Sequence, residues 1–310
     1  MIMKIAILIP CYNEELTVEK VVTDFKKYSS DADIYVYDNN SKDKTYELAV
    51  KSGAIVKKES KQGKGNVVKS MFRDIDADVY VLVDGDDTYP AEEVQKLIDP
   101  VINDNVDMVI GDRLSNGTYF SENKRGFHGF GNNLVKGLIN RLFRSNVKDI
   151  MTGYRAYSKR FVKCMPIMSD GFQIETEMTI FSLVYGMNIK EVPITYRDRP
   201  EGSESKLNTF SDGLKVLVTL FDLFKNYRPF LFFGIISFIF GLVGLIVGLP
   251  VITEFIQTAF ITKIPSAILA ASLCIISFIL FLVGVILDSI KNQTQILFQM
   301  HVNEFMRNKK

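Results

Sequence analysis

The sequence predicts an α/β fold, a doubly wound and mostly parallel sheet, followed by an α-helical membrane hairpin. Short β-rich runs alternate with helical stretches over residues 1–208, the pattern typical of parallel sheets. The run Val79–Val83 is apolar throughout, as expected for a central strand covered on both faces. Two uncharged stretches follow, Phe230–Leu249 with 20 residues and Ser266–Leu287 with 22. Each is long enough to cross a hydrocarbon core of about 30 Å as a helix.

The elements of the first domain follow from local patterns. Strands are expected at Lys4–Ile9, Ile34–Tyr37, Ala54–Lys57, Asp78–Val83 and Asp107–Ile110. A first helix should run from a cap at Asn13 to about Ser29, because apolar side chains recur there at helical spacing. Further helices are expected after Asn39–Asp43, after Lys61–Gly65 and from Ala91. Function should therefore gather at Pro10–Glu14, Asp38–Asp43, Gln62–Gly65 and Asp84–Asp87, the loops that follow strands.

The C-terminal part is predicted in three pieces. Residues 209–228 form an amphipathic helix in the membrane interface, or alternatively a helix packed on the first domain. Residues 229–290 hold two spans, about 230–252 and 266–288; a buried soluble hairpin is the alternative, but the glycine content favours the membrane. Residues 291–310 form a C-terminal tail. A new helix is expected to begin at Asp288–Gln293, where it could mediate homo-oligomerisation.

Charge placement predicts the orientation in the membrane. Lys215, Lys225 and Arg228 precede the first span, and Lys291, Arg307, Lys309 and Lys310 follow the second. The connecting loop holds a single basic residue, Lys263. The positive-inside rule then places the first domain and both termini in the cytoplasm. Residues Met1–Pro10 are expected to form a strand and not a signal peptide, so we expect a multi-pass protein of the plasma membrane.

Composition argues against several classes of function. A formal net charge of +1 argues against a nucleic-acid partner. Cys11, Cys164 and Cys274 show no metal or redox spacing and are expected to be buried free thiols. No G-x-G-x-x-G follows the first strand, and Gly63-Lys64-Gly65 lacks the Walker spacing. A dinucleotide dehydrogenase or a P-loop NTPase is therefore not expected.

Paired acids follow the predicted central strand. Asp84 and Asp86 fall just past its carboxyl end, where open α/β sheets place their ligands. Two carboxylates one residue apart can share a hard divalent cation such as Mg²⁺, which takes substrate phosphates as further ligands. The alternative is an acidic turn before a helix, with Asp87 or Thr88 as its cap and Pro90 in its first turn.

Nine short motifs together resemble a known family. They are Ile9–Glu14, Asp38–Asp43, Gly63–Gly65, Asp84–Asp86, Gly111–Arg113, Asp149–Arg155, Gln173–Glu177, Glu191–Ile194 and Asp198–Lys206. Their order and spacing resemble family 2 glycosyltransferases with the Rossmann-like GT-A fold. Within that family the chain is similar to polyprenyl-phosphate glycosyltransferases, the group of dolichyl-phosphate mannose synthases and their bacterial undecaprenyl-phosphate relatives with two C-terminal membrane helices. The resemblance covers roughly residues 1–290.

The resemblance implies an inverting transfer of a sugar from a nucleotide sugar to polyprenyl phosphate. A uridine diphosphate sugar and undecaprenyl phosphate are favoured, and a flippase and a further glycosyltransferase would then use the lipid-linked sugar for the cell envelope. Asp84 and Asp86 would hold Mg²⁺ or Mn²⁺, with Asp86 also catalytic; Thr88 stands where relatives often have glutamine. The implied donor site comprises Pro10, Tyr12, Glu14, Asp38, Asn40, Lys64, Asp84, Gly85 and Asp86.

The resemblance also implies an acceptor site with cations for the lipid phosphate. Its candidates are Arg113, Arg125, Arg199 and Lys206, and arginine suits phosphate because its planar fork binds two oxygens. Asp149 matches the usual general base, but a phosphate monoester has a second pKa of about 6 and needs no deprotonation at neutral pH. We therefore expect Asp149 to position the acceptor or a neighbouring cation.

Three other functions compete with this one. A processive polysaccharide synthase would resemble relatives that carry Gln-x-x-Arg-Trp, and this sequence contains no tryptophan. Transfer to the hydroxyl of another membrane acceptor would need a true base. A nucleotide-sugar sensor without activity is the third, and the intact acidic motifs argue against it.

Overall fold

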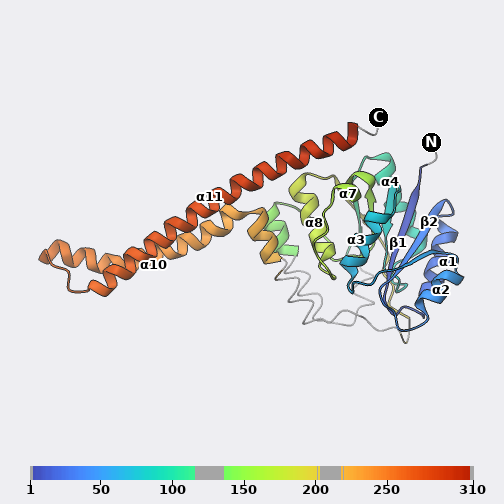
Figure 1. The fold of residues 1–310 in the computed structure, drawn as a ribbon, viewed down its shortest axis with the longest axis horizontal. Coiled ribbons are helices and arrows are strands. Elements are labelled where there is room, and N and C mark those ends of the chain that lie inside the picture. Colours follow the sequence, from blue (N-terminus) through green and yellow to red (C-terminus); the bar gives the residue numbers. More distant parts are fainter. Residues whose placement is uncertain (1–2, 116–135, 201, 203–217, 219, 308–310) are drawn as a thin grey trace. The chain divides into compact units, whose positions relative to one another are not determined.

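The computed structural model describes residues 3–115, 136–200, 202, 218 and 220–307. The chain divides into two compact units, Met1–Leu220 and Phe221–Lys310. The first unit contains the sheet and the second contains two long helices (Figure 1).

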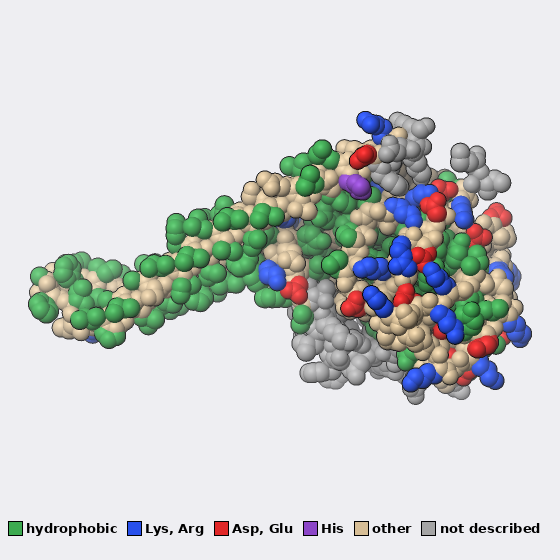
Figure 2. All heavy atoms as spheres, in the orientation of Figure 1, with side chains coloured by type: hydrophobic (Ala, Val, Ile, Leu, Met, Phe, Trp, Pro, Cys, Tyr) green, Lys and Arg blue, Asp and Glu red, His purple; other side chains and the backbone are tan. Residues whose placement is uncertain are grey.

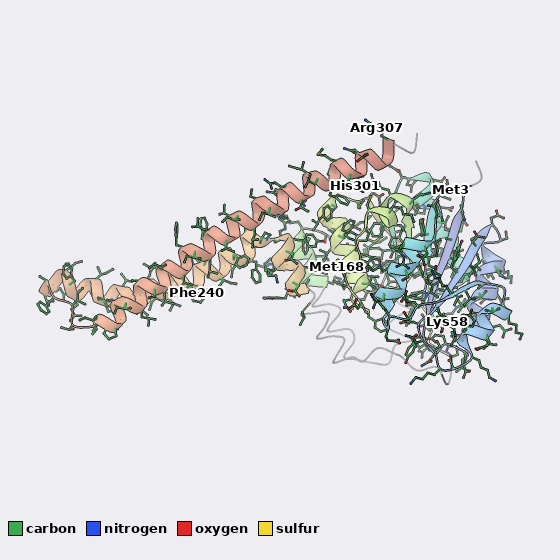
Figure 3. The ribbon with its side chains drawn as sticks, viewed as in Figure 1. Met3, Lys58, Met168, Phe240, His301 and Arg307 are labelled. Atoms are coloured by element: carbon green, nitrogen blue, oxygen red, sulfur yellow. The ribbon has the colours of Figure 1, made fainter. Side chains whose placement is uncertain are left out.

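Among the described residues, the first unit is built on a seven-stranded sheet. Its strands are β1 (Ile5–Cys11), β2 (Ala32–Asp38), β3 (Ile55–Lys58), β4 (Val79–Leu82), β5 (Met108–Asp112), β6 (Arg155–Ser158) and β7 (Ile189–Pro193), in the spatial order β3-β2-β1-β4-β6-β5-β7. Only β6 runs antiparallel to its neighbours β4 and β5. The prediction of a mostly parallel sheet is therefore confirmed. Lys58 lies on β3 at the edge of the sheet (Figure 3), where lysines discourage pairing with another chain.

Helices cover both faces of the sheet. They are α1 (Val18–Tyr28), α2 (Thr45–Lys51), α3 (Lys64–Asp74), the 3₁₀ turn η1 (Ala91–Glu93), α4 (Val94–Asn103), α7 (Lys159–Cys164) and α8 (Ile174–Tyr185). Val79 and Val81 of β4 point into the core that α1 and α4 fill with aliphatic side chains. Tyr80, on the other face of the same strand, packs against Phe72 of α3. All four residues of β4 are buried, as the unbroken apolar run predicts.

One predicted helix start is wrong. Asn13 does not cap α1, which begins at Val18. The backbone of Asn13 is left-handed, with φ of 52°, and its side-chain oxygen accepts a hydrogen bond from Lys42 N at 2.8 Å. Asn13 therefore links the first loop to the second instead of starting a helix.

The described residues of the second unit lie mainly in two apolar helices, α10 (Pro229–Thr258) and α11 (Ile264–Arg307). Both are long and apolar enough to cross a membrane, and hydrophobic side chains cover the face of them that Figure 2 shows. The two predicted spans lie inside them. The expected new helix at Asp288 is wrong, because α11 continues unbroken and Asp288 pairs with Lys291 one turn later at 3.2 Å. Half of the predicted interfacial helix, residues 209–217 and 219, lies outside the described part of the chain, and the described residues 220–227 are helical.

Small residues bring α10 and α11 together. Ser237 Oγ donates to Ser277 O at 2.7 Å, and Ser277 Oγ donates to Ser237 O at 2.8 Å. Gly241 faces the Ser277 hydroxyl so closely that a Cβ added there would lie 2.9 Å from it. Small side chains and reciprocal hydroxyl bonds are the usual contacts between helices in lipid. The contact is therefore suited to a membrane hairpin.

Candidate active site

The loops after β1, β2 and β4 each contain a non-glycine residue with left-handed backbone. These are Asn13, Asn40 and Asp87, with φ of 52°, 62° and 61°. The side chain of each residue makes a polar contact with a neighbouring segment. Asn13 accepts from Lys42 N, as described above, Asn40 Nδ2 donates to Ser60 O at 2.8 Å, and Asp87 Oδ1 lies 2.6 Å from Lys20 Nζ. Such conformations cost of order 1 kcal/mol each and cluster where loops bind ligands. The carboxyl end of the sheet is therefore the candidate site.

The paired acids lie at the end of β4. Asp86 is buried, and Thr88 Oγ1 donates to its Oδ1 at 2.7 Å while the Arg199 guanidinium pairs with its Oδ2. Burial, and then the charge of Asp84, raise the pKa of Asp86. Two adjacent carboxylates that repel each other in this way are a suitable donor set for a divalent cation. Thr88 has the geometry of a residue that orients Asp86.

Lys64 contacts the other acid of the pair. Its Nζ lies 2.5 Å from Asp84 Oδ1 and 2.6 Å from Glu175 Oε1. Burial alone would lower the pKa of Lys64, but Asp84 and Glu175 raise it, so the ammonium stays charged. Glu175 was not predicted as a site residue. Its place in the Gln173–Glu177 motif was the available signal.

Close approach of another loop explains the glycines around Lys64. A Cβ added to Gly65 would lie 2.0 Å from Ser169 O, and one added to Gly63 would lie 2.2 Å from Asp170 O. Asp170 O accepts a hydrogen bond from Gly65 N at 2.9 Å. This loop, which includes the exposed Met168 labelled in Figure 3, therefore caps the first turn of α3. Lys64, in that turn, pairs with Asp84 and Glu175.

Asp38 ends β2 beside the end of β1. Its side chain is buried, and its Oδ1 has no hydrogen-bond partner among the described residues. The next residue, Asn39, is fully engaged: its Nδ2 donates to Lys61 O at 2.7 Å and its Oδ1 accepts from Gly63 N at 2.7 Å. Buried carboxylate oxygens are normally hydrogen-bonded, so Asp38 is suited to accept a hydrogen bond from a ligand.

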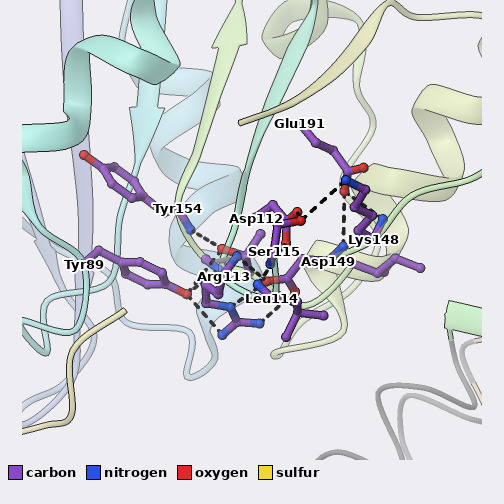
Figure 4. Close-up of polar contacts among 12 residues, drawn as sticks. Tyr89, Asp112, Arg113, Leu114, Ser115, Lys148, Asp149, Tyr154 and Glu191 are labelled. Atoms are coloured by element: carbon purple, nitrogen blue, oxygen red, sulfur yellow. Dashed lines mark hydrogen bonds and ion pairs between the residues drawn. The ribbon is translucent and has the colours of Figure 1, made fainter. Parts of the chain in front are cut away.

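A second cluster centres on Arg113 and Asp149 (Figure 4). Arg113 Nε donates to Asp149 Oδ2 at 2.7 Å, and Arg113 Nη2 donates to Asp149 Oδ1 at 2.9 Å. Asp149 is fully buried, which by itself raises its pKa, but the adjacent Arg113 guanidinium overcomes this and lowers the pKa of Asp149. Glu191 Oε1 accepts hydrogen bonds from the backbone N–H groups of Lys148 and Asp149 at 2.8 and 3.2 Å. Asp149 is thus a firmly held, ionised carboxylate whose partner is a cation.

Tyr89 and Gly153 join the two clusters. The Tyr89 hydroxyl accepts hydrogen bonds from Gly153 N at 3.0 Å and from Arg113 Nη1 at 3.4 Å. Gly153 packs so closely on Asp84 that an added Cβ would lie 2.3 Å from Asp84 Oδ2. The acid pair and the Arg113–Asp149 pair are therefore linked through Gly153 and the Tyr89 hydroxyl.

The remaining predicted residues lie at the same end of the sheet or outside the described chain. Pro10 ends β1 with Cys11, and Tyr12 follows it; both Pro10 and Tyr12 are partly buried. Glu14 is buried, and its N–H donates to Thr45 Oγ1 at 2.7 Å. Position 85 requires a glycine, because an added Cβ would lie 2.6 Å from Cys11 Sγ. Arg125 and Lys206 lie outside the described residues.

The cysteines meet the prediction only in part. All three are free, and Cys11 is buried as expected, between the loops of the site. The expected burial is wrong for the other two: Cys164 is half-buried at the end of α7, and Cys274 is exposed on α11.

The sequence and the fold are similar to those of known proteins. Residues 6–165 match the profile of the family described as glycosyl transferase family 2. Glycosyltransferase AglJ of Haloferax volcanii is 35% identical over 257 residues, which cover 81% of this chain and 82% of that protein. A dolichyl-phosphate hexose transferase of the same organism is 34% identical over 212 residues, 68% of this chain and 90% of the relative.

A solved structure shows the same fold. Glucosyl-3-phosphoglycerate synthase from Mycobacterium tuberculosis, crystallised with Mn²⁺, uridine diphosphate and glucosyl-3-phosphoglycerate, superposes with a TM-score of 0.60 at 20% identity. The superposition covers 71% of this chain and 80% of that one.

Proposed function

The chain belongs to glycosyl transferase family 2, and from this premise we propose that it transfers a sugar from a nucleotide sugar to the phosphate of a membrane polyprenol. The observation that supports the proposal is the link, through Gly153 and the Tyr89 hydroxyl, between an acid pair and a buried Arg113–Asp149 pair. One cluster suits a nucleoside diphosphate with its metal, and the other suits a phosphate. Two apolar helices and the similarity to a dolichyl-phosphate hexose transferase support a polyprenyl acceptor.

Asp84 and Asp86 would hold a divalent metal, Mg²⁺ or Mn²⁺. The mutual repulsion of the two acids and their hard carboxylate oxygens fit such an ion. The metal would supply Lewis-acid stabilisation of the negative charge that develops on the leaving diphosphate. The Mn²⁺ and uridine diphosphate in the related synthase structure support this assignment. Thr88 would keep Asp86 in the orientation that the metal requires.

Asp38 would bind the nucleoside. Its buried Oδ1 can accept a hydrogen bond from an N–H or O–H group of the base or ribose. Pro10, Tyr12, Glu14 and Asn40 border the same loops. We favour a uridine nucleotide, with Lys64 placed to face the diphosphate.

The transfer itself needs no proton to be removed. The bond from the anomeric carbon to the diphosphate oxygen breaks, and its electron pair leaves with the diphosphate. A lone pair of the acceptor phosphate, which is mostly dianionic at neutral pH, forms the new bond on the opposite face, so the configuration inverts. Asp149 then acts by holding Arg113 in place for the acceptor phosphate, and its low pKa and its two hydrogen bonds to Arg113 support this role over that of a base. Arg199, beside Asp86, would face the same phosphate.

The membrane hairpin would bring the site to the polyprenol. In this proposal α10 and α11 cross the plasma membrane, and the first unit and both termini are cytoplasmic, as the lysine and arginine distribution predicts. Undecaprenyl phosphate is the favoured acceptor. A flippase and a second transferase would then consume the product.

The test is transfer by the purified, detergent-solubilised full chain. It is mixed with undecaprenyl phosphate, Mn²⁺ and one radiolabelled nucleotide sugar at a time, and label in the organic phase is counted. We expect transfer from one donor, its loss in Asp86→Ala and Arg199→Ala, and its retention in Asp99→Ala, an exposed acid on α4. Tight nucleotide-sugar binding without transfer from any donor would contradict the proposed acceptor.

A further inference from the structure

Tyr89 belongs to the donor loop but ends at the acceptor cluster. It follows Thr88, whose hydroxyl and N–H both bind Asp86 Oδ1, at 2.7 and 3.2 Å. Its own hydroxyl lies 3.4 Å from Arg113 Nη1 and 3.0 Å from Gly153 N, which both donate to it. One short segment therefore orients a donor carboxylate at one residue and contacts the acceptor cation at the next.

The Tyr89 ring is tightly packed, so its hydroxyl has a fixed position. Only 4% of the residue is exposed, and its ring packs against Tyr154 at 5.3 Å and Tyr196 at 5.7 Å between centroids. The Tyr196 ring also lies against the Arg113 guanidinium, 5.5 Å from its carbon. Asp149 accepts hydrogen bonds from Nε and Nη2, and the Tyr89 hydroxyl accepts one from the third guanidinium nitrogen, Nη1.

We infer that Tyr89 is a positioning residue that sets the orientation of Arg113 toward the acceptor phosphate and couples it to the donor loop. The inference rests on the proposed function, because it takes Arg113 as a cation for the lipid phosphate. Loss of the hydroxyl removes none of the hydrogen bonds and ion pairs that hold Asp84 and Asp86. It should therefore weaken use of the polyprenyl phosphate and spare the nucleotide sugar.

The matched control is Tyr80, another buried tyrosine, which lies on β4. Its hydroxyl accepts from Ala77 N at 2.9 Å and donates to Ile75 O at 3.2 Å, at the opposite end of the strand from the acids. Tyr89→Phe and Tyr80→Phe each remove one buried, hydrogen-bonded hydroxyl. A loss caused only by structure should therefore appear in both.

The experiment measures steady-state transfer to undecaprenyl phosphate by wild type, Tyr89→Phe, Tyr80→Phe, Arg113→Lys and the double variant Tyr89→Phe/Arg113→Lys. We expect Tyr89→Phe to raise the KM for undecaprenyl phosphate about tenfold, the value of one hydrogen bond to a charged group, with the donor KM unchanged. Tyr80→Phe should leave both KM values unchanged. In the Arg113→Lys background Tyr89→Phe should add less than twofold, because residues that act through each other are not additive.

Each outcome decides a different point. If wild type transfers and Arg113→Lys raises the acceptor KM while Tyr89→Phe behaves like Tyr80→Phe, the inference about Tyr89 is wrong and the proposed function stands. Full additivity of Tyr89→Phe and Arg113→Lys, or an acceptor KM unaffected by Arg113→Lys, would also overturn the inference. If wild type transfers no sugar to the lipid phosphate, the proposed function fails and the inference fails with it.

Discussion

Replacing Gly153 with alanine should displace Asp84 and reduce transfer about 10²-fold. The added Cβ would lie 2.3 Å from Asp84 Oδ2 and 2.9 Å from its Cγ, about 1 Å short of ordinary van der Waals contact. Asp84 cannot simply turn away, because Lys64 Nζ holds its other oxygen at 2.5 Å. A misplacement of about 1 Å in a catalytic arrangement can cost about 10²-fold in rate. Overpacking should also cost about 1–3 kcal/mol of stability.

The assay compares kcat/KM and Tm of Gly153→Ala with those of Gly137→Ala. Gly137 has no atom within 4 Å of an added Cβ, so its variant tests the effect of a methyl group alone. We expect Gly137→Ala to keep the wild-type kcat/KM and to have a Tm equal to or slightly above that of wild type, because Gly137 lies in a helix, where alanine is favoured over glycine. A Gly153→Ala variant that folds and keeps wild-type kcat/KM would refute the claim that Asp84 must lie where the structure places it.

Three further predictions concern the two clusters. The pKa of Asp149 is lowered in the folded protein, so its ion pair with Arg113 stabilises the fold above the unfolded pKa of about 3.9 and is lost as pH falls through the lower folded value. Urea unfolding between pH 6 and pH 3 should therefore show a smaller pH dependence in Asp149→Asn than in wild type; equal slopes would be inconsistent with this pairing. Thr88→Val should lower kcat/KM about tenfold by freeing Asp86, whereas Thr23→Val, which removes an exposed hydroxyl bond on α1, should have no effect on activity. Treatment with EDTA should abolish transfer and added Mn²⁺ should restore it; full activity in EDTA would exclude the proposed metal.

Local patterns predicted the framework of the first unit well. The apolar run that became β4 and the acids after it needed only composition and the rule that ligands bind at the carboxyl ends of strands. The alternation of strands and helices likewise indicated the parallel part of the sheet. The antiparallel β6 was not predicted, because pairing direction depends on neighbours that are distant in sequence.

The contacts inside the site could not be read from the sequence. Lys64 meets Glu175, and Arg113 meets Asp149, across long stretches of chain, and no local pattern reports such pairs. Asn13 has the composition of a cap, but its left-handed backbone is set by hydrogen bonds to the second loop. The length of α11 was also missed, because the polar residues after the span resemble a helix start while they continue a helix already formed.

The central claim is that the nucleotide sugar binds at the acid pair and the acceptor phosphate at the neighbouring Arg113–Asp149 pair. Its most direct test compares Asp86→Asn with Arg113→Lys. Donor affinity is measured by nucleotide-sugar titration in Mn²⁺, and the acceptor KM is measured with undecaprenyl phosphate. We expect Asp86→Asn to lower the affinity for the nucleotide sugar at least tenfold. We expect Arg113→Lys to leave that affinity unchanged and to raise the acceptor KM. Equal loss of donor affinity in both variants would contradict the separation of the two clusters.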